Sequence, residues 1–132
     1  FAAAACPSSP PRGRGLRAFN PEGFAQSGFA KPGLFDSLLF AHVLEHMTAD
    51  EARALVQQHL PYLKKGGRVI VVTPQEAGYQ SDSTHVTFLD SEATSSLLRA
   101  LGLKVEKSYS FPFPRFIGRF FAHNEFVVVA RA

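Results

Sequence analysis

The stretch FDSLLFAHVLEHMTADEARALVQQHLPYLKKGGRVIVVTP, residues 35–74, decides the fold. It opens with a strand-like segment at residues 35–40 and closes with a β-branched run at residues 69–72, and both are typical of short strands. The second run shows no polar alternation, which is typical of a strand buried on both faces of a parallel sheet. We therefore expect a strand, a helix and a second strand parallel to the first.

The intervening helix has a start signal and a stop signal. Thr48 and Glu51 have the spacing of a capping box. Pro61 is expected to kink or restart the last turn, and Gly66-Gly67 allow a left-handed exit. Apolar residues recur at helical spacing and form one face: Ala52, Leu55, Val56, Leu60 and Leu63.

Working outward toward the C-terminus, the chain keeps alternating helix and strand. A second helix is expected at residues 91–101, with Asp90 as N-cap and Gly102 as its stop. Strands are expected at residues 103–111 and 126–130. The Phe-, Pro- and Arg-rich link between them resembles a long hairpin loop rather than a helical crossover. We therefore predict an α/β sheet whose last strand is antiparallel.

Toward the N-terminus the composition changes near Leu16. Residues 1–15 form a Pro-, Ser-, Gly- and Arg-rich irregular segment, and residues 16–132 form one domain. Residues 16–19 are expected to form a short strand that Asn20-Pro21 ends. The chain begins with Phe1 rather than Met, and we expect the domain to be incomplete at its N-terminus.

The composition of the 132-residue chain excludes several classes of protein. It is 45% hydrophobic and 19% charged, with a net charge of +3, which describes a globular domain. No basic stripe or RNA-binding aromatic motif is visible, so no nucleic-acid partner is expected. No apolar run approaches the ~18 residues of a membrane span. Cys6 is the only cysteine, which excludes an intrachain disulfide and suits a cytoplasmic protein.

Polar side chains follow the two strands of the opening stretch at the point where each strand ends. Ligands in open parallel sheets bind just beyond the carboxyl ends of the strands. Residues 41–46 leave the first strand, and residues 73–76 leave the second. If the two strands are neighbours, imidazole, carboxylate and amide groups meet in one cleft, where they can orient a polar substrate or move a proton.

The order of these motifs closely resembles the second half of class I S-adenosylmethionine-dependent methyltransferases. The resemblance covers residues 16–132 and implies a three-layer Rossmann-like sheet of seven strands, of which this chain would hold the third to the seventh. It rests on Phe35-Asp36, His42-Val43-Leu44-Glu45-His46, Lys64-Lys65-Gly66-Gly67, the run from Thr73 through Gln75, Glu76, Thr84, His85 and Phe88, then Leu101-Gly102-Leu103 and the closing strand.

The resemblance implies methyl transfer from S-adenosylmethionine to a small-molecule acceptor of unknown identity. Residues at Ala41, His42 and Val43 would line the methionine end of the cofactor. The candidate bases are His46, His42 and His85, because an alcohol or amine acceptor must lose a proton. Substrate contacts are expected from Glu45, Gln75, Glu76 and Tyr79. We expect no bound metal ion.

Two parts of the family pattern have no counterpart in this sequence: the glycine-rich turn after the first strand and the acidic residue that ends the second strand. A glycine-rich turn after the family's first strand holds the cofactor, and it requires backbone N–H groups at a helix start. Gly13-x-Gly15 does not replace it, because no strand precedes it. We therefore expect the chain to bind the cofactor poorly and to be inactive as a fragment.

Two other functions remain open at this point. His42, Glu45 and His46 match the His-x-x-Glu-His signature of zinc metallohydrolases, which would need both imidazoles on one helical face and a third ligand such as Glu106 or Glu125. A non-catalytic partner-binding domain is the other alternative. Its contact surface would be the aromatic loop, which we instead expect to be core or a lid over the cleft: Phe111, Phe113, Phe116, Phe120 and Phe121.

Overall fold

The computed structural model describes residues 17–132, so the predicted irregular segment and Leu16 lie outside the described residues. The helices are α1 Pro21–Gln26, α2 Ala49–His59, α3 Glu76–Gln80 and α4 Ser91–Ala100. The strands are β1 Phe35–Ala41, β2 Leu63–Pro74, β3 Lys104–Phe111 and β4 Glu125–Arg131. Short 3-10 turns are η1 Leu44–His46, η2 Leu60–Tyr62 and η3 Arg115–Arg119.

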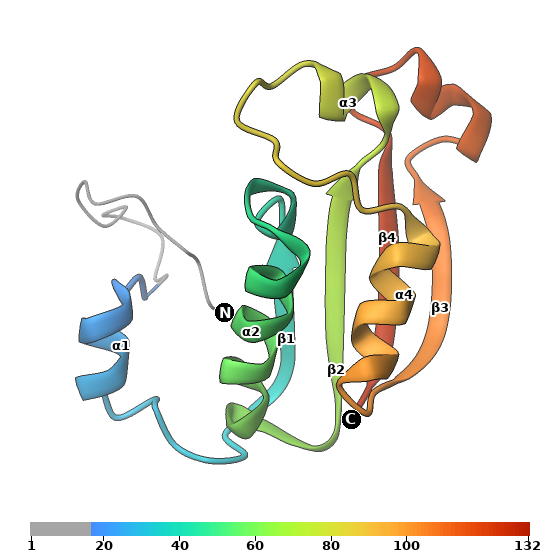
Figure 1. Ribbon diagram of the computed structural model, residues 1–132. Helices are drawn as coiled ribbons and strands as arrows, with labels where there is room; N and C mark the ends of the chain where they lie inside the picture. Colours follow the sequence, from blue (N-terminus) through green and yellow to red (C-terminus); the bar gives the residue numbers. More distant parts are fainter. Residues whose placement is uncertain (1–16) are drawn as a thin grey trace.

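The four strands form one mixed sheet in the order β1-β2-β4-β3 (Figure 1). β1 and β2 run parallel, with Ala41 opposite Val72. β4 lies antiparallel between β2 and β3. The predicted antiparallel last strand and the α/β fold class are therefore confirmed.

The predicted short strand at residues 16–19 is wrong over its described part, since residues 17–20 have no regular structure. Asn20 instead caps α1, and its side chain accepts a hydrogen bond from the Gly23 N–H at 2.6 Å. Phe19 packs against Phe24 and Phe29 rather than joining the sheet. The described strands therefore match the fourth to the seventh of the family sheet, not the third to the seventh.

α2 and α4 cover the same face of the sheet (Figure 1). The core between them joins Val56 of α2 and Leu98 of α4, both fully buried, to the inward side chains of the strands: Leu38, Phe40, Val69, Val71, Val128 and Ala130. On the opposite face Leu39 is 38% exposed and Ile70 is half-buried. The sequence predicts that residues 69–72 are buried on both faces of the sheet. Within residues 17–132, helices cover only one of these faces.

The helix boundaries follow the local signals in the sequence. The Glu51 N–H donates to Thr48 Oγ1 at 3.3 Å and the Thr48 N–H donates to Glu51 Oε2 at 3.0 Å, so the predicted capping box is confirmed. Leu63, expected on the helix face, is instead the first residue of β2, because η2 ends the helical segment around Pro61. Gly102 has a φ of +83°, which a left-handed helix exit requires.

Between residues 17 and 132 no helix combines the length and the apolarity needed to cross a membrane.

Leu98→Ala should lower the free energy of unfolding by about 2–5 kcal/mol, because it empties a fully buried site between α4 and the sheet. The matched control is Leu39→Ala on the uncovered face, where the side chain is 38% exposed, and its cost should stay below about 1 kcal/mol. Urea unfolding followed by circular dichroism measures both. Equal losses would contradict this account of which face is the core.

Candidate functional site

The exits of β1 and β2 lie side by side at one edge of the sheet, as the sequence predicts. The register places Ala41 opposite Val72. Just beyond it, the His42 N–H donates a hydrogen bond to the Val72 carbonyl at 3.0 Å. Residues 41–46 and 73–76 therefore begin at the same level of the sheet.

His42 stands at the turn out of β1 with a φ of +54°, a left-handed conformation that costs energy for a residue other than glycine. Its Nε2 lies 2.6 Å from Glu125 Oε1, and its Nδ1 lies 3.4 Å from Glu45 Oε1. The pKa of His42 is raised, chiefly by its contact with Glu45 and further by Glu125, while burial opposes the shift. The turn thus holds an imidazole between two carboxylates from distant parts of the chain.

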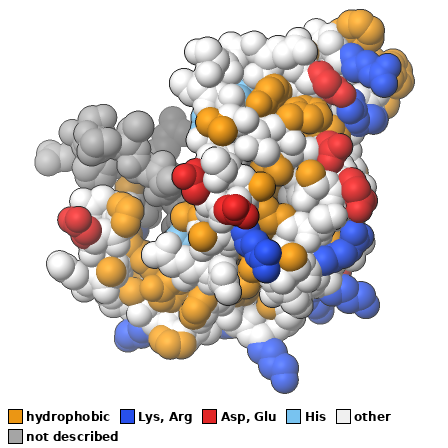
Figure 2. Space-filling view, in the orientation of Figure 1, with side chains coloured by type: hydrophobic (Ala, Val, Ile, Leu, Met, Phe, Trp, Pro, Cys, Tyr) orange, Lys and Arg blue, Asp and Glu red, His pale blue; other side chains and the backbone are white. Residues whose placement is uncertain are grey.

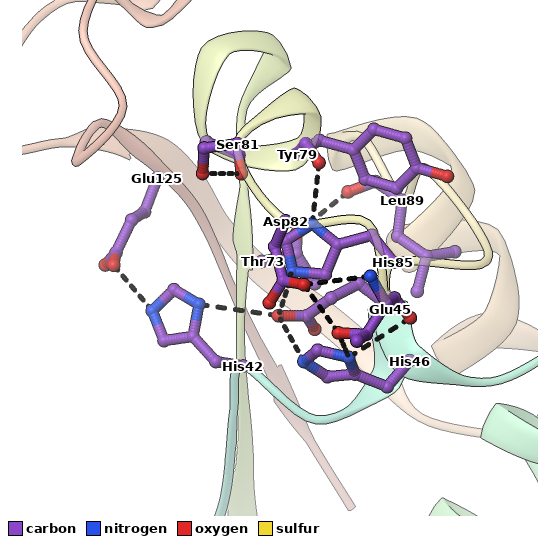
Figure 3. Close-up of polar contacts among 12 residues, drawn as sticks. His42, Glu45, His46, Thr73, Tyr79, Ser81, Asp82, His85, Leu89 and Glu125 are labelled. Atoms are coloured by element: carbon purple, nitrogen blue, oxygen red, sulfur yellow. Dashed lines mark hydrogen bonds and ion pairs between the residues drawn. The ribbon is translucent and has the colours of Figure 1, made fainter.

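Glu45 is the central side chain of the site. It lies on η1 and is fully buried. Neither of its carboxylate oxygens has a hydrogen-bond partner within residues 17–132. Its Oε1 lies 4.0 Å from His46 Nε2 and 4.0 Å from His85 Nε2 (Figure 3). A buried carboxylate is thus surrounded by imidazoles.

The structure brings the three predicted base candidates together around Glu45. The rings of His46 and His85 are 4.8 Å apart between centroids, and Tyr79 stacks on His85 with a centroid separation of 5.2 Å. The predicted substrate contacts Glu45 and Tyr79 therefore belong to this same cluster. Their functional roles stay predictions.

The loop after α3 is fastened to η1 by backbone hydrogen bonds. The N–H groups of Val86 and Thr87 both donate to the Glu45 carbonyl, at 2.7 and 3.1 Å. The hydroxyl of Thr73, at the end of β2, donates to the Leu89 carbonyl at 2.8 Å. These bonds hold the loop that carries His85 over the exit of β1.

The exit of β2 faces a different neighbour, the loop between β3 and β4. Gln75 is fully buried, and its amide N–H groups donate to Ser110 Oγ and to the Glu125 carbonyl. Asn124 donates to its amide oxygen at 3.0 Å. Glu76 makes a two-pronged ion pair with Arg115. Both side chains are occupied within the protein, and their roles as substrate contacts stay predictions.

The aromatic loop is not part of the core. Its phenylalanines are between 37% and 82% exposed, namely Phe111, Phe113, Phe116, Phe120 and Phe121. Figure 2 shows hydrophobic and basic side chains together over this corner of the molecule, at the upper right. The expectation was core or a lid over the cleft, and its core part is wrong, because the buried partners of the loop are polar: the Phe113 N–H donates to Asn124, and Asn124 donates to the Pro114 carbonyl. The lid part stays a prediction.

The zinc metallohydrolase interpretation needs His42 and His46 on one helical face. The positive φ of His42 places it outside any helix, and α2 begins only at Ala49. Its Nε2 binds Glu125 instead. That geometric requirement is not met.

Several residues of the site escaped the sequence analysis. Asp82 and Thr84 position His46, through hydrogen bonds from Thr84 Oγ1 to Asp82 at 2.7 Å and between Thr84 Oγ1 and His46 Nδ1 at 3.1 Å. Glu125 was considered only as a distant zinc ligand.

A pocket of about 170 Å³ is lined by residues from Arg17 to Phe35, at the opposite end of β1, so it does not belong to this cluster.

Comparisons with known proteins support the fold. No protein-family profile and no curated protein sequence matches the chain. A solved S-adenosylmethionine-dependent methyltransferase from Archaeoglobus fulgidus is similar over 76% of this chain and 61% of its own, with 15% identity and a TM-score of 0.61. The 1,6-didemethyltoxoflavin-N1-methyltransferase of Burkholderia thailandensis is similar over 76% and 44%, with 19% identity and a TM-score of 0.56.

A third solved structure is magnesium protoporphyrin IX methyltransferase from Synechocystis PCC 6803 with bound S-adenosylmethionine, similar over 82% of this chain and 42% of its own, with 18% identity and a TM-score of 0.52. The chain thus spans between 42% and 61% of the length of these three structures. Its fold is that of the class I S-adenosylmethionine-dependent methyltransferases.

Gly118→Ala should destabilise the chain by about 1–3 kcal/mol. A Cβ at Gly118 would overlap the Gln75 amide oxygen and lie 2.6 Å from its Cδ, so the amide that joins β2 to the aromatic loop must move. The control is Gly28→Ala, where a Cβ meets nothing within 4 Å and the change should stay within about 0.5 kcal/mol. Urea unfolding compares the two. A neutral Gly118→Ala would mean that Gln75 does not hold this loop.

Glu76→Gln should reduce stability near neutral pH by at most about 1 kcal/mol, because the pair with Arg115 is partly exposed. The pKa of Glu76 is lowered, chiefly by its hydrogen bond to Arg115. The stabilisation is therefore complete above the ordinary glutamate pKa of about 4.3 and is lost as pH falls through the lower folded-state value. Unfolding curves from pH 7 to pH 3 measure it, and an Arg115→Met background should abolish the difference.

Proposed function

We propose that the protein to which this chain belongs transfers a methyl group from S-adenosylmethionine to a small or medium-sized acceptor. One observation carries the proposal: in a methyltransferase fold, the exits of two neighbouring parallel strands bring three histidines and a carboxylate together at the edge of the sheet where ligands bind. The identity of the methylated atom stays open.

The residues after β1 suit the amino-acid end of the cofactor. Ala41 is small and exposed, and the adjacent left-handed turn at His42 leaves an imidazole and the Glu125 carboxylate at the same position. The Glu125 carboxylate can meet the ammonium group of an amino acid. The glycine-rich turn of the family has no counterpart in the sequence, so the fit covers only this end of the cofactor.

Bound S-adenosylmethionine supplies a methyl carbon that is open to in-line displacement. The task of this chain is to align the acceptor and to take its proton if the acceptor is an alcohol or amine. The His42 and His46 side chains are 47% and 36% exposed, whereas that of His85 is only 8% exposed. Proton removal is therefore assigned to His42 or His46, with His85 holding the cluster together.

Titration of the ¹⁵N-labelled chain with S-adenosylhomocysteine tests the proposal. We expect weak binding, with a dissociation constant of about 1 mM, because no glycine-rich turn contributes. Amide shifts should be concentrated at residues 41–46. Adenosine, which lacks the amino-acid end, is the matched control and should not move these amides.

Two results would contradict specific parts of this proposal. Unmoved amides at residues 41–46 in several millimolar S-adenosylhomocysteine, or the same shifts with adenosine, would count against a methionine-end site here. Saturable micromolar binding would support the site but overturn the expectation that the chain binds the cofactor poorly.

A further inference from the structure

We propose that Glu45, His46 and His85 bind a divalent first-row transition-metal ion. One ligand atom from each residue lies within 4.8 Å of the other two. Glu45 and His46 come from η1, directly after β1. His85 comes from the loop that follows α3, so α2 and β2 separate it from the other two residues along the chain. Figure 3 shows the three side chains together. The sequence-based expectation of no metal did not consider this combination.

The state of Glu45 is the first argument. Its side chain is fully buried, and both carboxylate oxygens lack a hydrogen-bond partner in the described part of the chain. An ionised carboxylate without partners is costly to remove from water. A cation bound next to Glu45 would supply the missing partner of its carboxylate oxygens.

The hydrogen bonds of the two imidazoles are the second argument. His85 Nδ1 lies 2.8 Å from the Tyr79 carbonyl, which only accepts, so Nδ1 carries the proton. His46 Nδ1 lies 3.1 Å from Thr84 Oγ1, whose own proton is donated to Asp82, so Nδ1 of His46 is again the donor. In the neutral imidazoles both Nε2 atoms therefore present lone pairs.

Those two lone pairs lie beside the same carboxylate oxygen, each 4.0 Å from Glu45 Oε1. Three acceptor atoms thus converge without a proton between them, and a cation satisfies all three. Histidines that bind metals commonly donate their other ring N–H to a carbonyl or a similar acceptor, which fixes the ring and directs the free nitrogen at the metal. Here the acceptors are the Tyr79 carbonyl for His85 and Thr84 Oγ1 for His46.

The ligand set indicates the kind of metal. Two imidazoles and one carboxylate with further positions open are typical of zinc hydrolytic sites and of non-haem iron(II) sites. Magnesium and calcium prefer oxygen ligands. Tetrahedral bonds of about 2.0–2.1 Å separate ligand atoms by roughly 3.4 Å. Each imidazole Nε2, 4.0 Å from Glu45 Oε1, must therefore approach that oxygen by about 0.6 Å. The ligand atoms lie within 4.8 Å of one another, so the most distant pair must close by up to about 1.4 Å. The 36% exposed side chain of His46 has room to move.

His42 offers the competing explanation, because its Nδ1 lies 3.4 Å from Glu45 Oε1 and its protonated ring would supply positive charge. However, its Nε2 is bound to Glu125 at 2.6 Å, and it is not among the three residues whose ligand atoms converge. If metal occupies the lone pairs of His46 and His85, His42 is the imidazole left for the acceptor. Metal binding itself does not depend on the proposed methyl transfer.

Calorimetric titration with Zn²⁺, without any nucleoside, tests the site. The 132-residue chain and its Cys6→Ser variant, which lacks the only thiol, should each bind one equivalent with a dissociation constant of about 1 µM or tighter. Mg²⁺ at the same concentrations should not bind. His46→Ala and His85→Ala should weaken binding by more than about 100-fold, and Thr84→Val by about 10-fold.

Three controls separate a metal site from surface histidines and from misfolding. His123→Ala should leave Zn²⁺ affinity unchanged. Glu45→Gln keeps the shape of the side chain and removes the unpaired buried charge, so this variant should unfold at the same or a higher temperature without metal and yet lose Zn²⁺ binding. Zn²⁺ should raise the unfolding temperature of the unmodified chain and of the variants that keep tight binding, and should leave that of Glu45→Gln, His46→Ala and His85→Ala unchanged.

Tight binding that survives in Glu45→Gln or in both histidine variants would overturn the proposal. So would the absence of Zn²⁺, Co²⁺ and Mn²⁺ binding by the folded, unmodified chain, or loss of binding only in His42→Ala. None of these outcomes changes the S-adenosylhomocysteine titration, so failure of the metal site and failure of the methyltransferase proposal are distinguishable.

Discussion

The parallel pairing of β1 with β2 brings the exits of two strands to one level, and the position of every group in the site depends on it. Because Ala41 lies opposite Val72 and the His42 N–H binds the Val72 carbonyl, the chain turns out of the sheet at a fixed point. η1 then folds back and buries Glu45. A register shift of one residue would move the side chains of Leu38 and Phe40 to the opposite face of the sheet and disrupt the core.

Glu45 links stability to function. A fully buried carboxylate without hydrogen bonds is a liability for folding. Its neighbours here are imidazoles from three positions. The same residue also anchors the next segment, since its backbone carbonyl accepts hydrogen bonds from the Val86 and Thr87 N–H groups. The local fold and the chemistry of the cluster are therefore set by one residue.

Much of the fold could be predicted because its signals are local. The capping box at Thr48, the β-branched run after Gly67 and the glycine stop at Gly102 each act within a few residues. The place of His42 and His46 at the edge of the sheet followed from strand topology, whereas His85 was named only through the family resemblance. The short strand predicted at residues 16–19 was wrong over its described part, residues 17–19, because so short a segment carries no information on whether a partner strand lies beside it.

Side-chain partners at the site were beyond the reach of sequence patterns. The loop at residues 81–90 has no periodicity, so nothing in it showed that Asp82 and Thr84 orient His46. The exposure of the aromatic loop has a similar cause. Phenylalanines usually pack inward, but here Gln75 and Asn124 supply the buried contacts of that segment, and a hydrophobicity pattern does not register buried amides.

The outer edge of β1 has a consequence for how this sheet can grow. Within residues 17–132, β1 pairs only with β2, so its other edge presents free backbone donors and acceptors, the kind of surface that accepts another strand. A strand added there in the parallel sense would extend the row of carboxyl ends, and its own exit would open beside Ala41 and His42. Within residues 17–132, only β2 lies beside the exit of β1. A segment that docks on the free edge of β1 would lie on the other side of that exit.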